Sequence, residues 1–148
     1  MRHSSYIPVG FFILIVCTQG WGWEFNTGKD GWVVTNAIAD LQAVDGKLVA
    51  TVAANMNDPY INGPNGPWNS DDIAGILMRV KASMDVSSYS GGAGPAIYYF
   101  NPAPYAKGFL LPKTDAWTSV LVDMTAEETW TGQLMNIRVD LADMVPQQ

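Results

Sequence analysis

Residues Leu134–Leu141 read LMNIRVDL, and this stretch decides how the rest of the chain is interpreted. From Met135 to Leu141 every second residue is apolar, and the residues between them are polar or charged. A period of two predicts a β-strand with one buried side, whereas a helix would place Arg138 among apolar side chains. Such a strand needs a second layer of structure against its apolar side. We therefore expect the remaining chain to supply a second sheet.

The composition fits one well-packed domain. The chain has 148 residues, of which 48% are hydrophobic and 15% charged, so it is long enough to bury a core of its own. The formal net charge is −6 and there is no basic run, which makes nucleic acid and anionic lipid poor partners. The 14 glycines and nine prolines are scattered and predict many turns between short strands.

Residues 1–22 have the pattern of a secretory signal peptide. Arg2 precedes the apolar run Val9–Cys17, and small residues follow that run. The run is short for a bilayer span, which takes about 20 apolar residues. We therefore expect cleavage to leave a secreted domain of residues 23–148 with no stable membrane span. The alternatives are a retained N-terminal strand and a single anchor.

Cleavage would also remove the side chains that enzymes use most often. His3 and Cys17 are the only histidine and the only cysteine. Without them the chain has no disulfide, no cysteine nucleophile, no histidine-based triad and no common zinc site. The carboxylate pairs Asp71-Asp72 and Glu127-Glu128 are adjacent in sequence, whereas a glycosidase needs two carboxyls facing each other about 5–10 Å apart. We therefore expect a protein that is not an enzyme.

Runs of aromatic and β-branched residues between turn residues predict about nine short strands and no helix of normal length. Asp45-Gly46 lies between two apolar runs and predicts a tight hairpin, because both turn positions tolerate positive φ. Ile73–Ser83 is the longest strand candidate. Other strands are expected at Trp23–Phe25, Trp32–Ile38, Lys47–Val52, Ala96–Phe100, Gly108–Leu111 and Trp117–Met124. The predicted fold class is all-β, an antiparallel two-sheet sandwich of the jelly-roll type.

Two segments depart from the strand pattern. Asn101–Lys107 contains two prolines, which lack backbone donors, and is predicted to be a loop. Ala53–Asp72 is rich in asparagine and proline and predicts a long loop with a short extended piece at Pro59–Ile61. Such a loop is either a binding loop or a solvated crossover between the sheets.

The order of several motifs resembles a known group of domains. The motifs are WEFNTGKDGW from Trp23, VDGKLVA from Val44, DPYI from Asp58, ILMRVKAS from Ile76, AIYYFN from Ala96, DAWTSVLVDM from Asp115 and TWTGQLMNIRVDL from Thr129. Together they resemble the galactose-binding-like jelly-roll domains of secreted sulfatases, glycosidases and other carbohydrate-active proteins. The resemblance implies a non-catalytic module from Trp23 to about Leu141. Many members bind sugars, and others act as scaffolds.

The resemblance also implies that one sheet lacks its last strand. In that family a further strand follows the segment that matches NIRVDL, whereas MVPQQ, after Asp143, shows no alternation. An unpaired strand edge invites another chain. The missing strand would come from another subunit or from the protein's own N-terminus, or its absence would be tolerated.

Aromatic residues in loops or in outward positions are the candidate platforms for a sugar, because aromatic rings stack on the apolar face of a sugar. Trp68 in NGPWNSDD is the first candidate, and the alternative is a lid over the end of the sandwich. Tyr98 and Phe100 are expected to face the core, which would turn Tyr99 outward. The predicted ligand-binding residues are Trp68, Asn69, Tyr60, Tyr99, Asn101, Tyr105 and Arg138, with Trp130 and Asp71 as further candidates and Trp23, Trp32 and Trp117 expected in the core or at its ends.

Asn57 and Asp58, and Asp71 and Asp72, offer oxygen ligands of the kind that calcium prefers. A structural calcium ion is therefore one expectation, and the alternative is that these residues only form turns. No other cofactor is expected.

Two functions follow from these observations. The first is a secreted carbohydrate-binding module with a glycan or polysaccharide as its partner. The second is a structural subunit of an extracellular fibre, coat or surface layer, which forms homo-oligomers or filaments by strand exchange at an open sheet edge. A small hydrolase that uses carboxylates alone is a third alternative.

Overall fold

The computed structural model describes residues 10–16, 22–53, 58–82, 94–110 and 116–141. These residues form strands and turns and contain no helix, which confirms the all-β class. The strands are β1 Gly10–Val16, β2 Gly22–Trp23, β3 Val33–Asn36, β4 Ile38–Val44, β5 Lys47–Val52, β6 Tyr60–Asn62, β7 Trp68–Asn69, β8 Gly75–Ala82, β9 Ala96–Asn101, β10 Ala103–Gly108, β11 Thr118–Asp123, β12 Gln133–Leu134 and β13 Ile137–Asp140. No helix with the length and hydrophobicity of a bilayer span occurs in this part of the chain.

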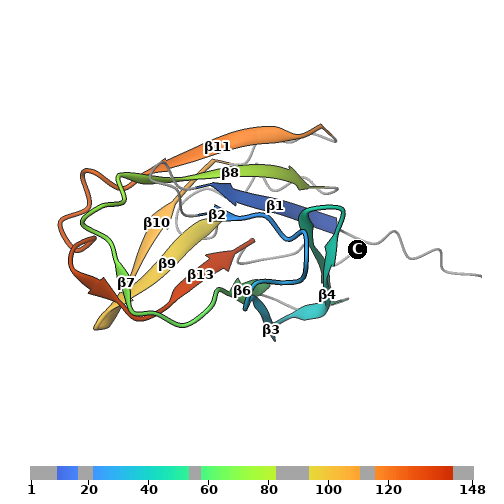
Figure 1. The fold of residues 1–148 in the computed structure, drawn as a ribbon, viewed down its shortest axis with the longest axis horizontal. Coiled ribbons are helices and arrows are strands. Elements are labelled where there is room, and N and C mark those ends of the chain that lie inside the picture. Colours follow the sequence, from blue (N-terminus) through green and yellow to red (C-terminus); the bar gives the residue numbers. More distant parts are fainter. Residues whose placement is uncertain (1–9, 17–21, 54–57, 83–93, 111–115, 142–148) are drawn as a thin grey trace, which may run out of the picture.

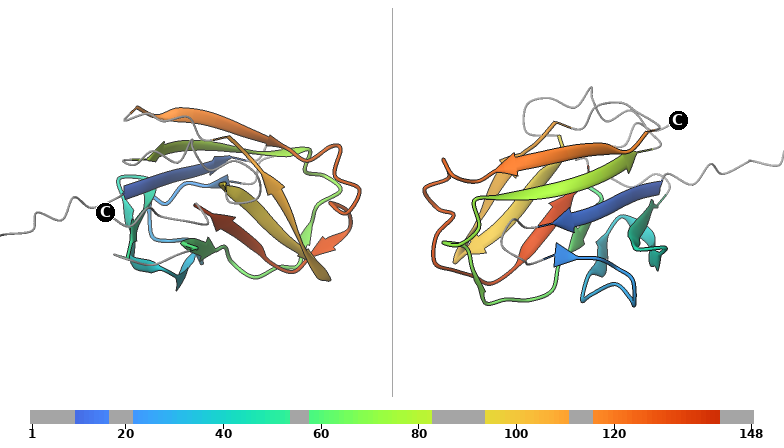
Figure 2. Two further views of the ribbon diagram at one scale, coloured as in Figure 1. Left: turned by 180° about the vertical axis from the view of Figure 1, so that it is seen from behind. Right: turned by 45° about the horizontal axis from the view of Figure 1, so that its top comes forward.

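The strands form two large sheets and one small ladder, and every pairing is antiparallel. The first sheet has the order β11-β8-β1-β5-β4, with β2 paired to β1. The second sheet has the order β10-β9-β13-β6-β3, and β7 pairs with β12 outside both. The two sheets lie as layers over one another (Figures 1 and 2), which is consistent with a β-sandwich.

Apolar side chains from both sheets meet in a shared core between the layers. Met78 and Leu48 come from the first sheet, and Ile97 and Val139 come from the second; all four are buried. The predicted alternation of the longest strand is confirmed, because Ile76, Met78 and Val80 are buried while Arg79 is exposed. Burial of such side chains away from water is the main favourable term in folding.

The Asp45-Gly46 hairpin is confirmed. Strands β4 and β5 pair up to Val44 and Lys47, which leaves Asp45 and Gly46 as the turn. Their φ angles are 49° and 71°, so both central residues adopt the left-handed conformation that this hairpin turn requires.

The strand predicted at Leu134–Leu141 is interrupted. Met135 is 55% exposed, whereas Leu134 is buried, so the alternation predicted to begin at Met135 is wrong for that residue. The backbone changes partners here, because β12 pairs with β7 while β13 pairs with β6 and β9. From Ile137 to Leu141 the predicted apolar face is buried as expected.

The face predicted for Ala96–Phe100 is also wrong. Tyr99 and Ile97 are both 0% exposed, and Tyr98 is the residue that points away from the core. Tyr99 pairs with Ile137 and Ile97 pairs with Val139, so β9 turns the same face inward as the buried residues of β13. The neighbouring strand therefore sets the side that is buried.

The segment predicted as a loop at Asn101–Lys107 contains strand β10. Pro104 is tolerated in β10 because this strand lies at the edge of its sheet and pairs only with β9, so fewer backbone donors are needed. Pro102 lies in the bend between β9 and β10. The strand predicted at Gly108–Leu111 is wrong in its described part. Gly108 ends β10, Phe109 and Leu110 are not in a strand, and Leu111 lies outside the described residues.

Most of the apolar run Val9–Cys17 forms strand β1. This strand lies inside the first sheet, with β5 on one side and β8 on the other. The structure therefore uses, as a central strand, the segment that the sequence interprets as part of a signal peptide.

Candidate functional site

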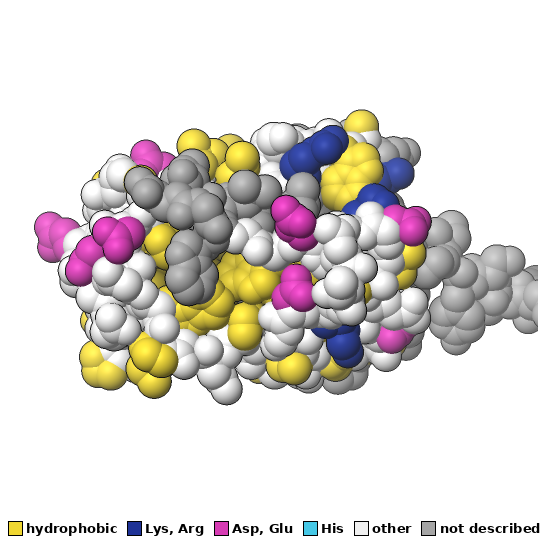
Figure 3. Space-filling model, viewed as in Figure 1, with side chains coloured by type: hydrophobic (Ala, Val, Ile, Leu, Met, Phe, Trp, Pro, Cys, Tyr) yellow, Lys and Arg dark blue, Asp and Glu magenta, His cyan; other side chains and the backbone are white. Residues whose placement is uncertain are grey.

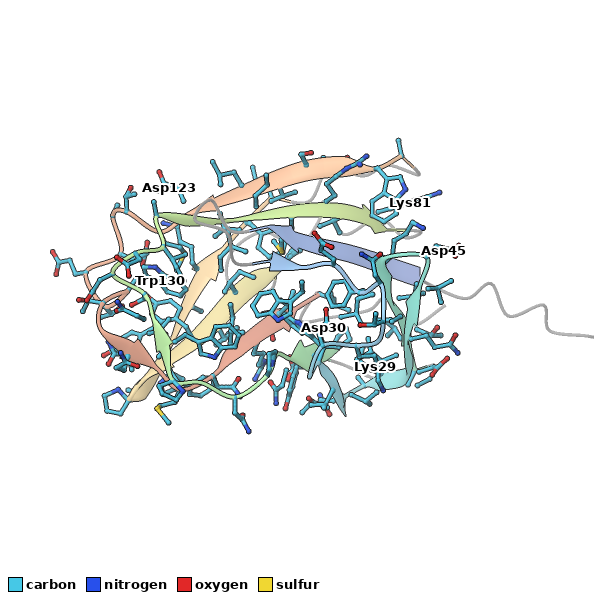
Figure 4. All side chains as sticks on the ribbon, in the orientation of Figure 1. Lys29, Asp30, Asp45, Lys81, Asp123 and Trp130 are labelled. Atoms are coloured by element: carbon cyan, nitrogen blue, oxygen red, sulfur yellow. The ribbon has the colours of Figure 1, made fainter. Side chains whose placement is uncertain are left out.

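A hollow of about 130 Å³ lies beside β2, between residues of β8 and β13. Three tryptophans line it, Trp23, Trp68 and Trp130, together with aliphatic side chains and Asn136. We call this hollow the tryptophan pocket. Figure 3 shows hydrophobic side chains gathered in the middle of one face of the molecule, and Figure 4 shows Trp130 at the end opposite Lys81.

Trp68 is held over the tryptophan pocket by the β7–β12 ladder. Its backbone pairs with Leu134, and its ring lies 5.3 Å from the ring of Trp23 at an angle of 61°. The chain approaches this ladder closely at Gly66, where an added Cβ would lie 2.2 Å from the carbonyl oxygen of Leu134. Only glycine fits there, so the loop before Trp68 can pack directly against β12.

Trp130 enters the tryptophan pocket from the loop between β11 and β12. Its indole Nε1 donates to the carbonyl oxygen of Ile73 at 2.8 Å, and its ring packs edge-on against Tyr99 at 5.0 Å. A buried indole N–H normally needs such a partner. The bond therefore fixes which part of the ring faces the hollow.

Asn136 supplies the polar side chain of the lining. Its Nδ2 donates to Oδ1 of Asn65 at 3.1 Å. Its own Oδ1 is buried and has no hydrogen-bond partner among the residues that the structure describes. A buried acceptor left without a donor costs about 1–3 kcal/mol. A ligand hydroxyl that donates to this oxygen would remove that cost.

Asp71 ties the loop that carries Trp130 to the segment after β7. Its Oδ1 accepts from the backbone N–H of Gly132 at 2.7 Å and from the hydroxyl of Thr131 at 2.9 Å. The Gly132 bond and then the Thr131 bond lower the pKa of Asp71 below its ordinary value of 3.8. Asn69, its predicted companion, is exposed and donates to Asp72 at 3.1 Å.

We expect the fold to lose stability in acid partly through Asp71. Because its pKa is lowered on folding, its contribution is fully present above 3.8 and is lost as the pH falls below 3.8 through the folded pKa. Urea unfolding at a series of pH values measures this loss. The variant Asp71→Asn should show a shallower acid dependence than the wild type. Asp72→Asn removes the same charge without removing the Gly132 bond, and an equal effect of both variants would contradict this role.

Asn101, Tyr99 and Tyr105 lie behind the loop that carries Trp130. The amide of Asn101 donates to the carbonyl oxygens of Thr129 at 3.1 Å and Thr131 at 2.7 Å. The ring of Tyr105 stacks on Tyr99 at 5.7 Å. In the structure these three predicted ligand-binding residues support the loop, and Tyr99 has no exposed surface.

Tyr60 and Arg138 meet on the outer face of the second sheet. The guanidinium of Arg138 lies 3.5 Å from the ring centre of Tyr60 and 4.6 Å from that of Tyr98. Its Nε and Nη2 both donate to Asp140, and Nη2 also lies 3.3 Å from Asp58. Burial by itself lowers the pKa of Arg138, but the hydrogen bond and charge of Asp140 outweigh burial and raise that pKa above its ordinary value. The Nε and Nη2 groups of Arg138, which were predicted to bind a sugar, thus donate to Asp140.

The residues predicted to bind calcium have separate partners. Asp58 contacts Arg138, whereas Asp71 contacts the loop at Gly132 and Asp72 contacts Asn69. Asn57 lies outside the described residues. Within the described ranges no three His, Cys, Asp or Glu side chains are grouped so that they could hold a metal ion.

The sequence singled out Trp68 and Trp130 as candidate ligand-binding residues, but not the pocket residues Trp23 and Asn136. Trp23 was expected in the core or at its end, and Asn136 was expected only as the polar side of a strand. Strand pairing and the packing of the layers bring these residues together. A local sequence motif does not predict which distant strands will pair or pack. Trp32, by contrast, is buried in the core as expected.

No protein-family model matches the chain, and no curated protein or solved structure matches it. The resemblance to galactose-binding-like domains therefore remains an expectation from the motifs.

Proposed function

We propose that this protein is a non-catalytic carbohydrate-binding domain, and that its tryptophan pocket receives a sugar ring. The observation that carries the proposal is the grouping of three indole rings and a buried acceptor around one hollow. The C–H face of a pyranose is apolar and stacks on an indole, while its hydroxyls need hydrogen-bond partners. The pocket offers both kinds of contact.

The size of the hollow favours a single ring. Its volume of about 130 Å³ is close to that of an apolar cavity of about 150 Å³ that takes up benzene. An extended polysaccharide segment would not fit in it. The expected ligand is therefore the terminal sugar of a glycan, inserted with its apolar face against the tryptophans.

We also propose that the strands have the jelly-roll topology that the resemblance implies. Strands β5, β6, β8 and β9 lie alternately in the first and second sheets, and β7, between β6 and β8 in the chain, lies outside both. In a jelly roll the chain also crosses between two sheets. This alternation supports the likeness to sugar-binding modules of that fold.

The variant Trp68→Ala should weaken glycan binding at least tenfold, equivalent to about 1.4 kcal/mol, because it removes one stacking surface. A glycan array would identify a ligand, and calorimetry with that ligand would give the affinity. Trp117→Ala is the matched control, because it removes an indole that contacts Arg79 instead of the pocket. Equal affinity of wild type and Trp68→Ala, with both folded, would rule out the pocket as the site.

The variant Asn136→Leu tests the proposed hydrogen bond between a ligand hydroxyl and Oδ1 of Asn136. Leucine keeps the approximate size of the side chain and removes the acceptor. Sugar binding should weaken, while affinity for a single-ring apolar probe such as benzene should not. If the variant binds both ligands as the wild type does, the pocket is an apolar site and the hydroxyl contact is wrong. Absence of any glycan ligand for the folded wild type would overturn the proposed function.

A further inference from the structure

Strand β1 is central in its sheet although it is the first strand of the described residues. It pairs with β5 from Gly10 to Ile13 and with β8 from Phe11 to Val16. It also pairs with β2, where Ile15 lies opposite Trp23. No strand of the described chain precedes it, and residues 17–21 join it to the remainder of the fold. Strand β1 could therefore leave the sheet without displacing any other strand of the described residues.

The place occupied by β1 cannot be closed by its neighbours. Both β5 and β8 run antiparallel to β1, so they run parallel to each other. Adjacent strands lie about 4.7–4.9 Å apart, so without β1 the edges of β5 and β8 would face each other across roughly twice that distance. Their backbone groups could not reach one another. The slot between β5 and β8 must therefore be filled by one strand antiparallel to both.

The register shows which residues this slot accepts. Position 11 stands opposite Ala50, position 13 opposite Leu48 and Val80, and position 15 opposite Met78. All four of these neighbours are buried. Apolar residues therefore suit these three register positions, and the sequence has Phe11, Ile13 and Ile15 there.

We propose that Gly10–Val16 is an exchangeable strand, and that the slot between β5 and β8 receives this segment from a second copy of the chain. A second copy is the occupant that matches the slot at every position, since it restores each pair made by β1, including Ile15 with Trp23. Exchange of an identical element between two copies is a low-cost route to a dimer.

This inference depends on strand β1 and not on glycan binding. The sequence predicts strand exchange at an open sheet edge, whereas the structure places the exchangeable strand inside the sheet. The proposal requires that the chain keeps residues 10–16, which is the retained-strand alternative to cleavage. A reciprocal dimer would carry two tryptophan pockets, and would bind a clustered glycan more tightly than a single copy does.

Cysteine trapping between two different copies tests the exchange. One full-length chain carries Leu14→Cys, the other carries Arg79→Cys, and Cys17→Ser is present in both. Positions 14 and 79 lie directly opposite each other in β1 and β8, and such pairs are close enough for a disulfide. After the two chains are mixed, unfolded and refolded together, we expect a covalent heterodimer under mild oxidation. The off-register pair Leu14→Cys with Lys81→Cys is the control and should cross-link much less.

Three results would overturn the proposal. They are equal cross-linking of the matched and off-register pairs, no heterodimer although a single chain carrying both cysteines cross-links internally, and an intact mass showing that residues 1–22 are absent from the isolated protein. None of these results would affect the glycan affinity of the wild type or of Trp68→Ala. Failure of the exchange is therefore distinguishable from failure of the proposed function.

Discussion

Replacement of Arg138 by methionine should lower the free energy of unfolding by about 3–5 kcal/mol. Asp140 is 0% exposed, and Arg138 donates two hydrogen bonds to it. Methionine keeps much of the length of the side chain, so packing against Tyr60 and Tyr98 is largely retained. The main change is that a buried carboxylate loses its cation. Urea unfolding near neutral pH measures the effect.

A double variant separates the lost charge partner from lost packing. Arg138→Met with Asp140→Leu removes both charges, and most of the lost stability should return, because an apolar pair often replaces a buried ion pair at little cost. Arg79→Met, at an exposed position, is the control and should change stability by less than about 0.5 kcal/mol. If the double variant is as unstable as Arg138→Met, the guanidinium acts mainly by packing against the two tyrosines.

Replacement of Tyr99 by alanine should destabilise the fold by about 3–5 kcal/mol, the usual cost of removing a buried aromatic side chain. The ring has no exposed surface and lies between Tyr105 and Trp130. Tyr99→Phe removes only the hydroxyl contact with Thr129 at 2.7 Å and should cost about 1 kcal/mol. Thermal and urea unfolding of both variants check these values.

The same pair of variants tests the role that the sequence predicts for Tyr99 in ligand binding. If Tyr99 only supports the core, Tyr99→Phe should bind glycan with wild-type affinity. A tenfold loss in that variant, with its stability nearly unchanged, would show that the hydroxyl takes part in recognition. That result would also mean that the core around Trp130 opens when the ligand binds.

Local sequence patterns were sufficient to predict those features of the fold that depend only on neighbouring residues. The Asp45-Gly46 turn could be predicted because its conformation depends on the two residues themselves. The alternation in β8 could be predicted because Arg79 lies between two apolar residues, so only one face suits the core. In Ala96–Phe100 both faces carry apolar or aromatic side chains, so the period shows a strand but not which face is buried.

The long loop around Trp68 also shows that a local pattern does not predict contacts with residues distant in sequence. Its composition predicted either a binding loop or a crossover between the sheets, with Trp68 as the first candidate residue. It contained no information about Trp23 or Asn136, which are far away in sequence and reach the hollow through other strands. The single-ring size of the pocket, and the support that Tyr99 and Asn101 give to the Trp130 loop, were likewise beyond prediction.

The sequence by itself determined that this chain is an antiparallel all-β protein, where its tightest turn lies, and which indole to examine first. Those properties follow from side-chain period and from the conformational freedom of single residues. Only the tertiary structure decided which tryptophans share a hollow, that Arg138 is paired with a buried aspartate, and that an apolar leader-like segment lies in the middle of a sheet. These facts depend on which strands become neighbours, and pairing between distant segments is set by the packing of the whole core.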